Sequence, residues 1–248
     1  MVLPEGIWCR WGASTLKAKS EALRTAGAAK KPAGASRSEG AQKRLPHAER
    51  KAQILKTAAE FFADNGLSAQ TRRLADECGI SQRLLYRFFP TKEDLLNEVY
   101  RQEILGVFKV SWFADLQDRN SPAEQRLVLF YQDYLNVTLT RKWLRLFMYA
   151  SLADARMAPD YISAIVTQLM EVIVREVAAE KEVVLPDDRA ALHEIGWTLH
   201  GAISHYAIRR HLYHASNILP EQKVIAMHVR SFVAGFDSIV QDYVDHLD

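Results

Sequence analysis

The sequence predicts an all-α protein, and three observations support this fold class. From residue 47 onward, apolar residues recur at intervals of three and four, which is the period of an amphipathic helix. No stretch of useful length alternates apolar and polar residues in the way that a strand requires. Capping residues, glycines and prolines divide the chain into segments of helical length.

The composition is that of an ordinary folded protein, with 48% hydrophobic and 25% charged residues, so a core can form. The two cysteines, Cys9 and Cys78, lie far apart and make neither a disulfide framework nor a metal quartet. No apolar run reaches the roughly 18 residues that a membrane span needs, and the first residues lack the pattern of a secretory signal. We therefore expect a cytoplasmic protein with no membrane partner.

Charge is distributed unevenly along the chain, although the formal net charge is only +2. Residues 1–45 hold nine lysines and arginines against three acidic residues, whereas the part after residue 95 holds fifteen against twenty. Residues 1–46 are also rich in Ala, Ser, Gly and Lys without an apolar period, which predicts a disordered basic arm. A polyanion is expected to meet this end of the chain, unless the arm is an upstream stretch without function.

Three helices are expected before residue 90. The first covers residues 47–65 and stops at an Asn-Gly pair, a common helix end. The second covers Thr71–Cys78 and ends at Gly79. The third covers Gln82–Phe88, with Ser81 as its N-cap.

The second and third of these helices form a helix-turn-helix pattern. Ala75 is small where the two helices must cross closely, and Gly79 lies where the turn favours a positive φ. Leu74 and Leu85 are among the apolar positions that let the second helix of the pair lie across the first. We assign residues 47–96 to a helix-turn-helix DNA-binding domain.

One face of the third helix carries the side chains that are expected to read DNA. With Leu85 pointing inward, the rotation of about 100° per residue turns Arg83 and Arg87 to the opposite side. Tyr86 joins them, and Gln82 lies on the flank. Arginine pairs bidentately with guanine and glutamine with adenine, and helix starts at 71 and 91 can hold phosphates. The expected DNA-binding residues are Thr71, Arg72, Ser81, Gln82, Arg83, Tyr86, Arg87, Thr91 and Lys92.

Longer helices are expected downstream. Pro90 cannot continue the third helix, and TKED at residues 91–94 is a capping box that opens a helix to about Ala114. SPAE at residues 121–124, with Ser121 as cap, is a second helix start. Further breaks are expected at Thr140, Pro159, Pro186 and Pro220.

The segment AERKAQILKTAAEFFADNGLSAQTRRLADECGISQRLLYRFFPTKEDLL resembles the N-terminal region of the TetR family of bacterial transcriptional regulators. The resemblance implies a homodimer, a helical C-terminal domain with a ligand pocket, and ligand-controlled release from an operator. It places Thr71, Gln82, Tyr86 and Lys92 at positions that commonly touch DNA. The chain departs from the family at three positions. Arg83 and Leu84 replace a common Gly-Thr pair, and Gln70 replaces a usual Ser or Thr cap.

Residues 97–248 are accordingly assigned to a helical ligand-binding and dimerisation domain. The last two helices carry a broad apolar stripe and several small residues, which predicts a two-fold, four-helix interface. The alternative is that the stripe is intrachain core. The expected interface residues are Trp197, Gly201, His205, Phe232, Gly235, Phe236 and Ile239.

Aromatic residues between the fourth and seventh helices are expected to be core, or to line a pocket for a largely apolar small molecule. The pocket candidates are Trp112, Phe130, Tyr134, Trp143, Phe147 and His200. The histidines of the C-terminal domain lack the spacing of a metal site, so we expect no metal and no other cofactor. The identity of the small molecule does not follow from the sequence.

Two functions are considered. The first is a sequence-specific, dimeric regulator, in the form of a repressor that a small molecule releases from a palindromic operator in double-stranded DNA. The second is an architectural protein that binds DNA without sequence preference, which the basic arm favours. An enzyme is not expected, because the sequence holds no nucleophile elbow, phosphate loop, HExxH motif or dinucleotide turn.

Overall fold

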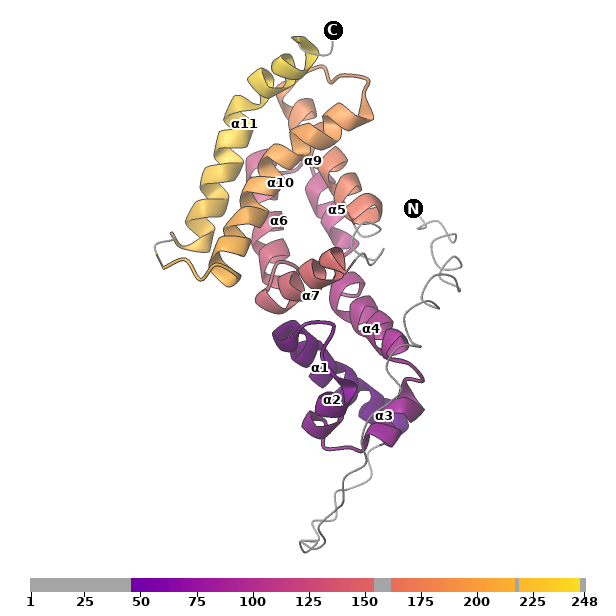
Figure 1. The fold of residues 1–248 in the computed structure, drawn as a ribbon. Helices are drawn as coiled ribbons and strands as arrows, with labels where there is room; N and C mark the ends of the chain where they lie inside the picture. The colour runs from indigo at the N-terminus through magenta and orange to yellow at the C-terminus, as the bar shows by residue number, and fades with distance from the viewer. Residues whose placement is uncertain (1–45, 154–161, 217–218, 246–248) are drawn as a thin grey trace, which may run out of the picture. The chain divides into compact units, whose positions relative to one another are not determined.

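The computed structural model describes residues 46–153, 162–216 and 219–245. All regular secondary structure in these ranges is helical (Figure 1), so the predicted fold class is confirmed. These residues belong to one compact unit, which spans Leu45–Asp248. The expected arm lies outside the described residues except for Pro46, and the expected break at Pro159 also lies outside them.

Three short helices build the N-terminal part as predicted: α1 (His47–Asn65), α2 (Thr71–Glu77) and α3 (Gln82–Phe88). Gly79, in the turn between α2 and α3, has a φ of 64°, a conformation that glycine adopts without a steric cost. Leu74 and Leu85 are buried against α1, at 0% and 1% exposure. This small core fixes α3 across α2.

The helix that follows is shorter than predicted. The capping box of Thr91 and Asp94 is present at the start of α4 (Lys92–Tyr100), but the expected extension to about Ala114 is wrong. A π-helical turn, η2 (Arg101–Leu105), follows, and the N–H of Gly106 donates to the carbonyl of Arg101 at 2.8 Å. Because glycine disfavours the helix interior, the chain leaves the helix there and starts α5 (Ser111–Gln117).

The next helix, α6 (Ala123–Val137), begins where the sequence predicted a helix start, but its cap differs from the predicted Ser121. Ser121 does not cap it; Pro122 is the N-cap and makes no side-chain hydrogen bond. The N–H of Ala123 instead donates to the Glu180 carboxylate at 2.6 Å. A carboxylate from a distant helix therefore satisfies the exposed amide and the positive end of the α6 dipole.

Five more helical segments complete the described C-terminal part. The expected break at Thr140 is present, and the Thr140 hydroxyl caps the first of these helices by accepting the Trp143 N–H. They are α7 (Arg141–Leu152), η3 (Ile162–Val166), α9 (Thr167–Lys181), α10 (Arg189–His211) and α11 (Glu221–Asp245). A buried ion pair ties α6 to α9, since Arg126 and Glu176 are 3.0 Å apart and Arg119 contacts the same carboxylate at 2.9 Å. None of the described helices is long and apolar enough to span a membrane.

Aromatic rings fill the centre of the C-terminal part. Trp112 contacts Phe130 and Tyr134 with centroid distances of 5.8 and 5.3 Å, and Tyr134 contacts His200 at 5.5 Å. All four are buried. Trp143 and Phe147 form a separate stack on α7, at 4.7 Å. The rings that were considered as pocket residues thus pack against one another, and a ligand pocket among them stays a prediction.

Cations of α7 join the C-terminal part to the end of α1. The guanidinium of Arg145 donates to the Ala63 carbonyl, to the Asp64 carbonyl at 3.3 Å and to the Tyr149 hydroxyl at 2.7 Å. Arg141 pairs with the Asp64 carboxylate at 2.8 Å. The last turn of α1 has no basic residue of its own, so these cations from α7 complement its negative end.

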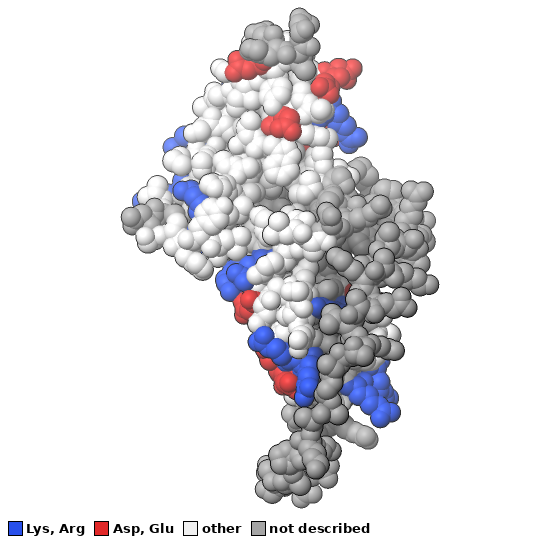
Figure 2. All heavy atoms as spheres, viewed as in Figure 1, with Lys and Arg blue, Asp and Glu red and all other residues white. Residues whose placement is uncertain are grey.

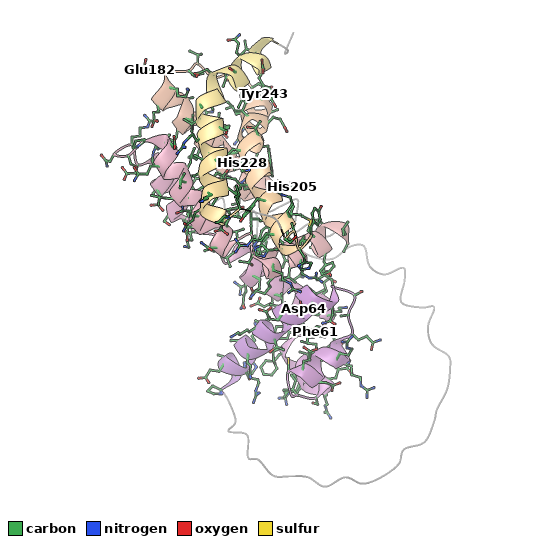
Figure 3. The ribbon with its side chains drawn as sticks, turned by 90° about the vertical axis from the view of Figure 1, so that its left-hand side faces the viewer. Phe61, Asp64, Glu182, His205, His228 and Tyr243 are labelled. Carbon is green, nitrogen blue, oxygen red and sulfur yellow. The ribbon has the colours of Figure 1, made fainter. Side chains whose placement is uncertain are left out.

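Lys142 extends this contact to η2, the segment that follows α4. Its ammonium lies 3.3 Å from the Glu60 carboxylate of α1 and 2.7 Å from the Glu103 carboxylate of η2. Asp64, labelled in Figure 3, marks the end of α1 where the contact lies. We call Arg141, Lys142 and Arg145 the α7 cations. They hold α1 from one side while the opposite face of α7 is buried.

Replacing Arg145 with methionine should lower the free energy of unfolding by about 1–2 kcal/mol, because the carbonyls of Ala63 and Asp64 lose a charged donor. Methionine keeps an apolar stem of similar length, so packing is largely preserved. Arg175→Met is the matched control, since this exposed arginine pairs only with Glu171 in a surface i, i+4 bridge and should change stability by less than about 0.5 kcal/mol. Urea unfolding compares the two; equal losses would refute the role of Arg145.

Stability should also fall on acidification because of His200. Burial lowers the pKa of this imidazole from 6.5 to about 4, so between these values the unfolded chain takes up a proton that the folded chain excludes. The stabilisation is complete above pH 6.5 and is lost as the pH falls toward 4, by about 2 kcal/mol between pH 7 and pH 5. His200→Gln should abolish this difference in urea unfolding; an unchanged pH dependence would contradict the assignment.

Candidate DNA-binding surface

The outward face of α3 carries two arginines and a glutamine. Arg83, Arg87 and Gln82 are exposed, and Leu85 on the opposite side is 1% exposed. Among the described residues, neither arginine makes a hydrogen bond or an ion pair, so both guanidinium groups keep all five donors. This orientation agrees with the helical rotation expected from the sequence, and the contact with DNA stays a prediction.

Side-chain caps stabilise the first turns of α3 and α4. The Ser81 hydroxyl accepts the Leu84 N–H at 3.2 Å. The Thr91 hydroxyl accepts the Asp94 N–H at 3.0 Å and donates to the Asp94 carboxylate at 2.8 Å. Ser81 and Thr91, both expected to contact DNA, therefore serve as helix caps in this structure.

Thr71, at the start of α2, links two residues of α3. Its hydroxyl lies 2.9 Å from the Tyr86 hydroxyl and accepts a hydrogen bond from the Gln82 amide nitrogen at 3.3 Å. Thr71 is only 7% exposed, whereas Tyr86 is 37% exposed. The hydroxyl is directed toward α3 in this structure, and the expected contact between Thr71 and a phosphate stays a prediction.

Lys92, at the start of α4, contacts the loop that precedes α2. Its ammonium donates to the Ala69 carbonyl at 2.8 Å and lies 5.7 Å from the centre of the Phe62 ring. Burial lowers the pKa of this half-buried ammonium below its usual range. One of its three donors is used, so Lys92 both anchors the loop before α2 and retains donors for a phosphate.

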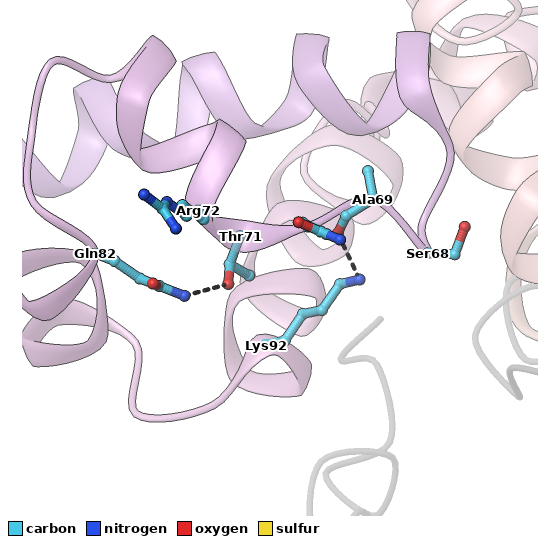
Figure 4. Close-up of a pocket in the computed structure, with 7 residues that line it drawn as sticks. Ser68, Ala69, Thr71, Arg72, Gln82 and Lys92 are labelled. Carbon is cyan, nitrogen blue, oxygen red and sulfur yellow. Dashed lines mark hydrogen bonds between the residues drawn. The ribbon is translucent and has the colours of Figure 1, made fainter. Parts of the chain in front are cut away.

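An open pocket of about 410 Å³ lies between the starts of α2, α3 and α4. Figure 4 shows the bonds from Gln82 to Thr71 and from Lys92 to Ala69 that frame it. Arg72, which is exposed, adds a second cation. The lining residues are Ser68, Ala69, Gln70, Thr71, Arg72, Gln82 and Lys92.

Sequence reasoning missed the loop residues of this pocket. Gln70 is the N-cap of α2 but makes no side-chain cap bond, as its departure from a usual Ser or Thr suggested. Ser68 and Ala69 carry no motif, and Ala69 contributes through its backbone carbonyl. Lys92 reaches the Ala69 carbonyl because α4 packs against this loop. No local sequence pattern predicts this contact.

Basic side chains gather over the helix-turn-helix end of the described chain. Figure 2 shows several Lys and Arg side chains, with Asp and Glu among them, on the part of its face formed by α1–α3, whereas much of the face over α10 and α11 is uncharged. Positive charge beside exposed α3 is the electrostatic feature expected of a surface that meets a polyanion. Within the described residues, no group of three or more His, Cys, Asp or Glu could hold a metal ion.

The three N-terminal helices and this surface define a helix-turn-helix protein. The family profile described as "Bacterial regulatory proteins, tetR family" matches residues 54–99. The repressor KstR2 of Mycolicibacterium smegmatis is 36% identical over 88 residues, which are 35% of this chain and 42% of that protein. The activator FasR of the same organism is 37% identical over 76 residues, or 30% of this chain and 33% of the relative.

Solved structures extend the likeness of fold beyond the matched sequence. A TetR-like regulator from Rhodococcus sp. RHA1 has a TM-score of 0.58 and 19% identity, over 79% of this chain and 99% of that one. A putative TetR-family regulator from Mesorhizobium loti MAFF303099 has a TM-score of 0.56 and 15% identity, over 77% and 98%. The profile match and the curated relatives thus show that the N-terminal part is similar to TetR-family transcriptional regulators, and the solved structures show a TetR-like fold for the described chain.

Proposed function

We propose that this chain regulates transcription by binding a specific operator in double-stranded DNA through the outward face of α3. The observation that carries this proposal is the pair of exposed, unpaired arginines on α3, Arg83 and Arg87. Both lie on the helix that a helix-turn-helix inserts into the major groove. Guanidinium groups without protein partners are free to pair with guanine edges or phosphates.

The active form in this proposal is a homodimer that reads a palindromic operator. Gly201 and Gly235 have open space where a side chain would stand, and Figure 3 shows α10 and α11 side by side beside the labelled His205 and His228. A flat and weakly charged face of this kind suits two-fold packing. Two such heads would read half-sites about 34–36 Å apart, or a multiple of that distance.

The interface proposed here differs in part from the sequence expectation. Phe232 and Phe236 are 4% and 0% exposed within one chain, so their rings belong to the intrachain core. They were expected at the interface because α11 is apolar on more than one side. Trp197 and Ile239 are half-buried, and His205 is exposed. These three side chains, with the two glycines, remain the candidates for the interface.

A small, largely apolar molecule would release the regulator from DNA. Such a ligand must bind the two states of the protein with different affinity, or it shifts nothing. The route that we propose runs from the aromatic rings of the C-terminal part through α7 to α1 and α4. Trp143 and Phe147 lie on the inner side of α7 and the α7 cations on its outer side, so a displaced ring would move the end of α1.

Repression is proposed as the direction of control, as in the relative named repressor KstR2. The relative FasR is named an activator, so the matched domain serves both directions. The alternative function is architectural DNA binding without sequence preference, which the nine basic residues of residues 1–45 favour. Selection from a randomised DNA pool separates the two, because phosphate contacts alone enrich no sequence.

Arg83→Ala and Arg87→Ala should each weaken binding to the selected operator by about 5-fold to 150-fold at fixed salt, the loss expected for one bidentate arginine–guanine contact. Lys223→Ala is the control, because this exposed cation lies on α11, away from α3, and should leave the affinity unchanged. Fluorescence anisotropy with labelled operator gives the dissociation constants. Affinities of both arginine variants equal to the control would refute the α3 face.

A further inference from the structure

The hydrogen bonds of Thr71 limit what Gln82 can present to DNA. A glutamine amide has one oxygen acceptor and two N–H donors. One N–H is used by the Thr71 hydroxyl at 3.3 Å. Among the described residues Gln82 has no other side-chain partner, and its side chain is exposed. The oxygen and the second N–H are therefore the groups left for a base edge.

This pair of groups matches one base better than the other three. In the major groove adenine offers a donor at N6 beside an acceptor at N7, which an amide oxygen and an amide N–H satisfy together. Guanine offers two acceptors, thymine one acceptor and a methyl group, and cytosine a single donor. An amide turned over to offer both N–H groups to guanine would keep its contact with Thr71 only if the Thr71 hydroxyl donated its hydrogen to the amide oxygen.

The contact between Thr71 and Tyr86 supports the same orientation. Thr71 Oγ1 has one hydrogen, and it lies 2.9 Å from the Tyr86 hydroxyl, where either group can donate. If the 37% exposed Tyr86 hydroxyl donates outward to a phosphate, its oxygen accepts the Thr71 hydrogen. The lone pairs of Thr71 then remain for the Gln82 N–H. A phosphate contact at Tyr86 thus strengthens the chain of bonds that orients Gln82.

We propose that Thr71 is a positioning residue for base readout: its buried hydroxyl holds the Gln82 amide so that Gln82 selects adenine in each half-site of the operator. Thr71 itself does not contact DNA in this assignment. The proposal rests on the proposed function, because it requires that α3 reads a specific sequence. It goes further by naming the base and the residue that sets the choice.

The burial of Thr71 explains why this orientation is preserved. At 7% exposure, its hydroxyl is largely screened from water, and an unpaired buried hydroxyl would cost about 1–3 kcal/mol. The Gln82 and Tyr86 side chains satisfy it. Releasing Gln82 to suit another base would leave Thr71 with one partner fewer, and this cost adds to the mismatch at the base edge.

The test begins with the full chain and a randomised DNA pool, from which wild-type protein selects its operator. Gln82→Ala then identifies the base pair that Gln82 reads, as the position whose preference disappears. Affinities for all four bases at that position are measured for wild type, Thr71→Val and Thr71→Ser. Valine has the shape of threonine without the hydroxyl, and serine is the matched control that keeps the hydroxyl.

Wild type and Thr71→Ser should prefer adenine by about 5-fold to 150-fold. Thr71→Val should lose most of that preference, while preferences at the other positions stay the same. A uniform loss across all positions and bases would show a purely structural or phosphate-contacting role for Thr71 and overturn the proposal. So would an unchanged profile in Thr71→Val or a preferred base other than adenine.

Gln82→Glu keeps the proposal testable even if Thr71→Val does not fold, because residue 82 is exposed. A carboxylate has no N–H for adenine N7 and can still accept from the Thr71 hydroxyl. The preference should therefore move from adenine to cytosine, whose N4 group donates to carboxylates. Retention of adenine would overturn the proposal. Failure of wild type to select any sequence would refute the proposed function instead, which separates the two failures.

Discussion

The contact between the α7 cations and the carboxyl end of α1 is the constraint on which the position of the candidate surface depends. The last turn of α1 has no basic residue, and its exposed carbonyls face Arg145. Because α2 and α3 pack on α1 through a small shared core, whatever holds α1 also orients α3. Lys142 adds a bridge to both α1 and η2, so these two segments are joined through this one side chain of α7.

The side chains around α3 divide into those that build the surface and those that it presents. Ser81 and Thr91 are used as caps, and Thr71 is turned inward to Gln82 and Tyr86. Each of these hydrogen bonds gives a partner to a backbone N–H or a hydroxyl group that would otherwise need one from water. What remains outward and unpaired is mainly arginine. In the proposed function, specificity comes from a few free side-chain groups on α3, and for Gln82 the neighbouring Thr71 holds the amide.

The sequence predicted much of this arrangement because the relevant signals are local. Gly79, Ser81 and the TKED capping box each act within one turn of the chain, and all three are present. Two predictions about helix ends and caps were wrong. The end of α4 lies at a local π-helical turn before Gly106, whereas the cap of α6 comes from Glu180 on a distant helix, α9. No spacing within one helix reveals such contacts.

We propose that DNA binds to the α2–α3 surface, which the contact between α7 and α1 orients. Amide hydrogen exchange of the full chain with and without its selected operator tests this claim most directly, since it maps the protected segments without any substitution. The account predicts slower exchange in the peptides that cover residues 71–88 and the start of α4, with little change in α10 and α11. Protection that spares residues 82–88 and appears elsewhere in the described chain would contradict it.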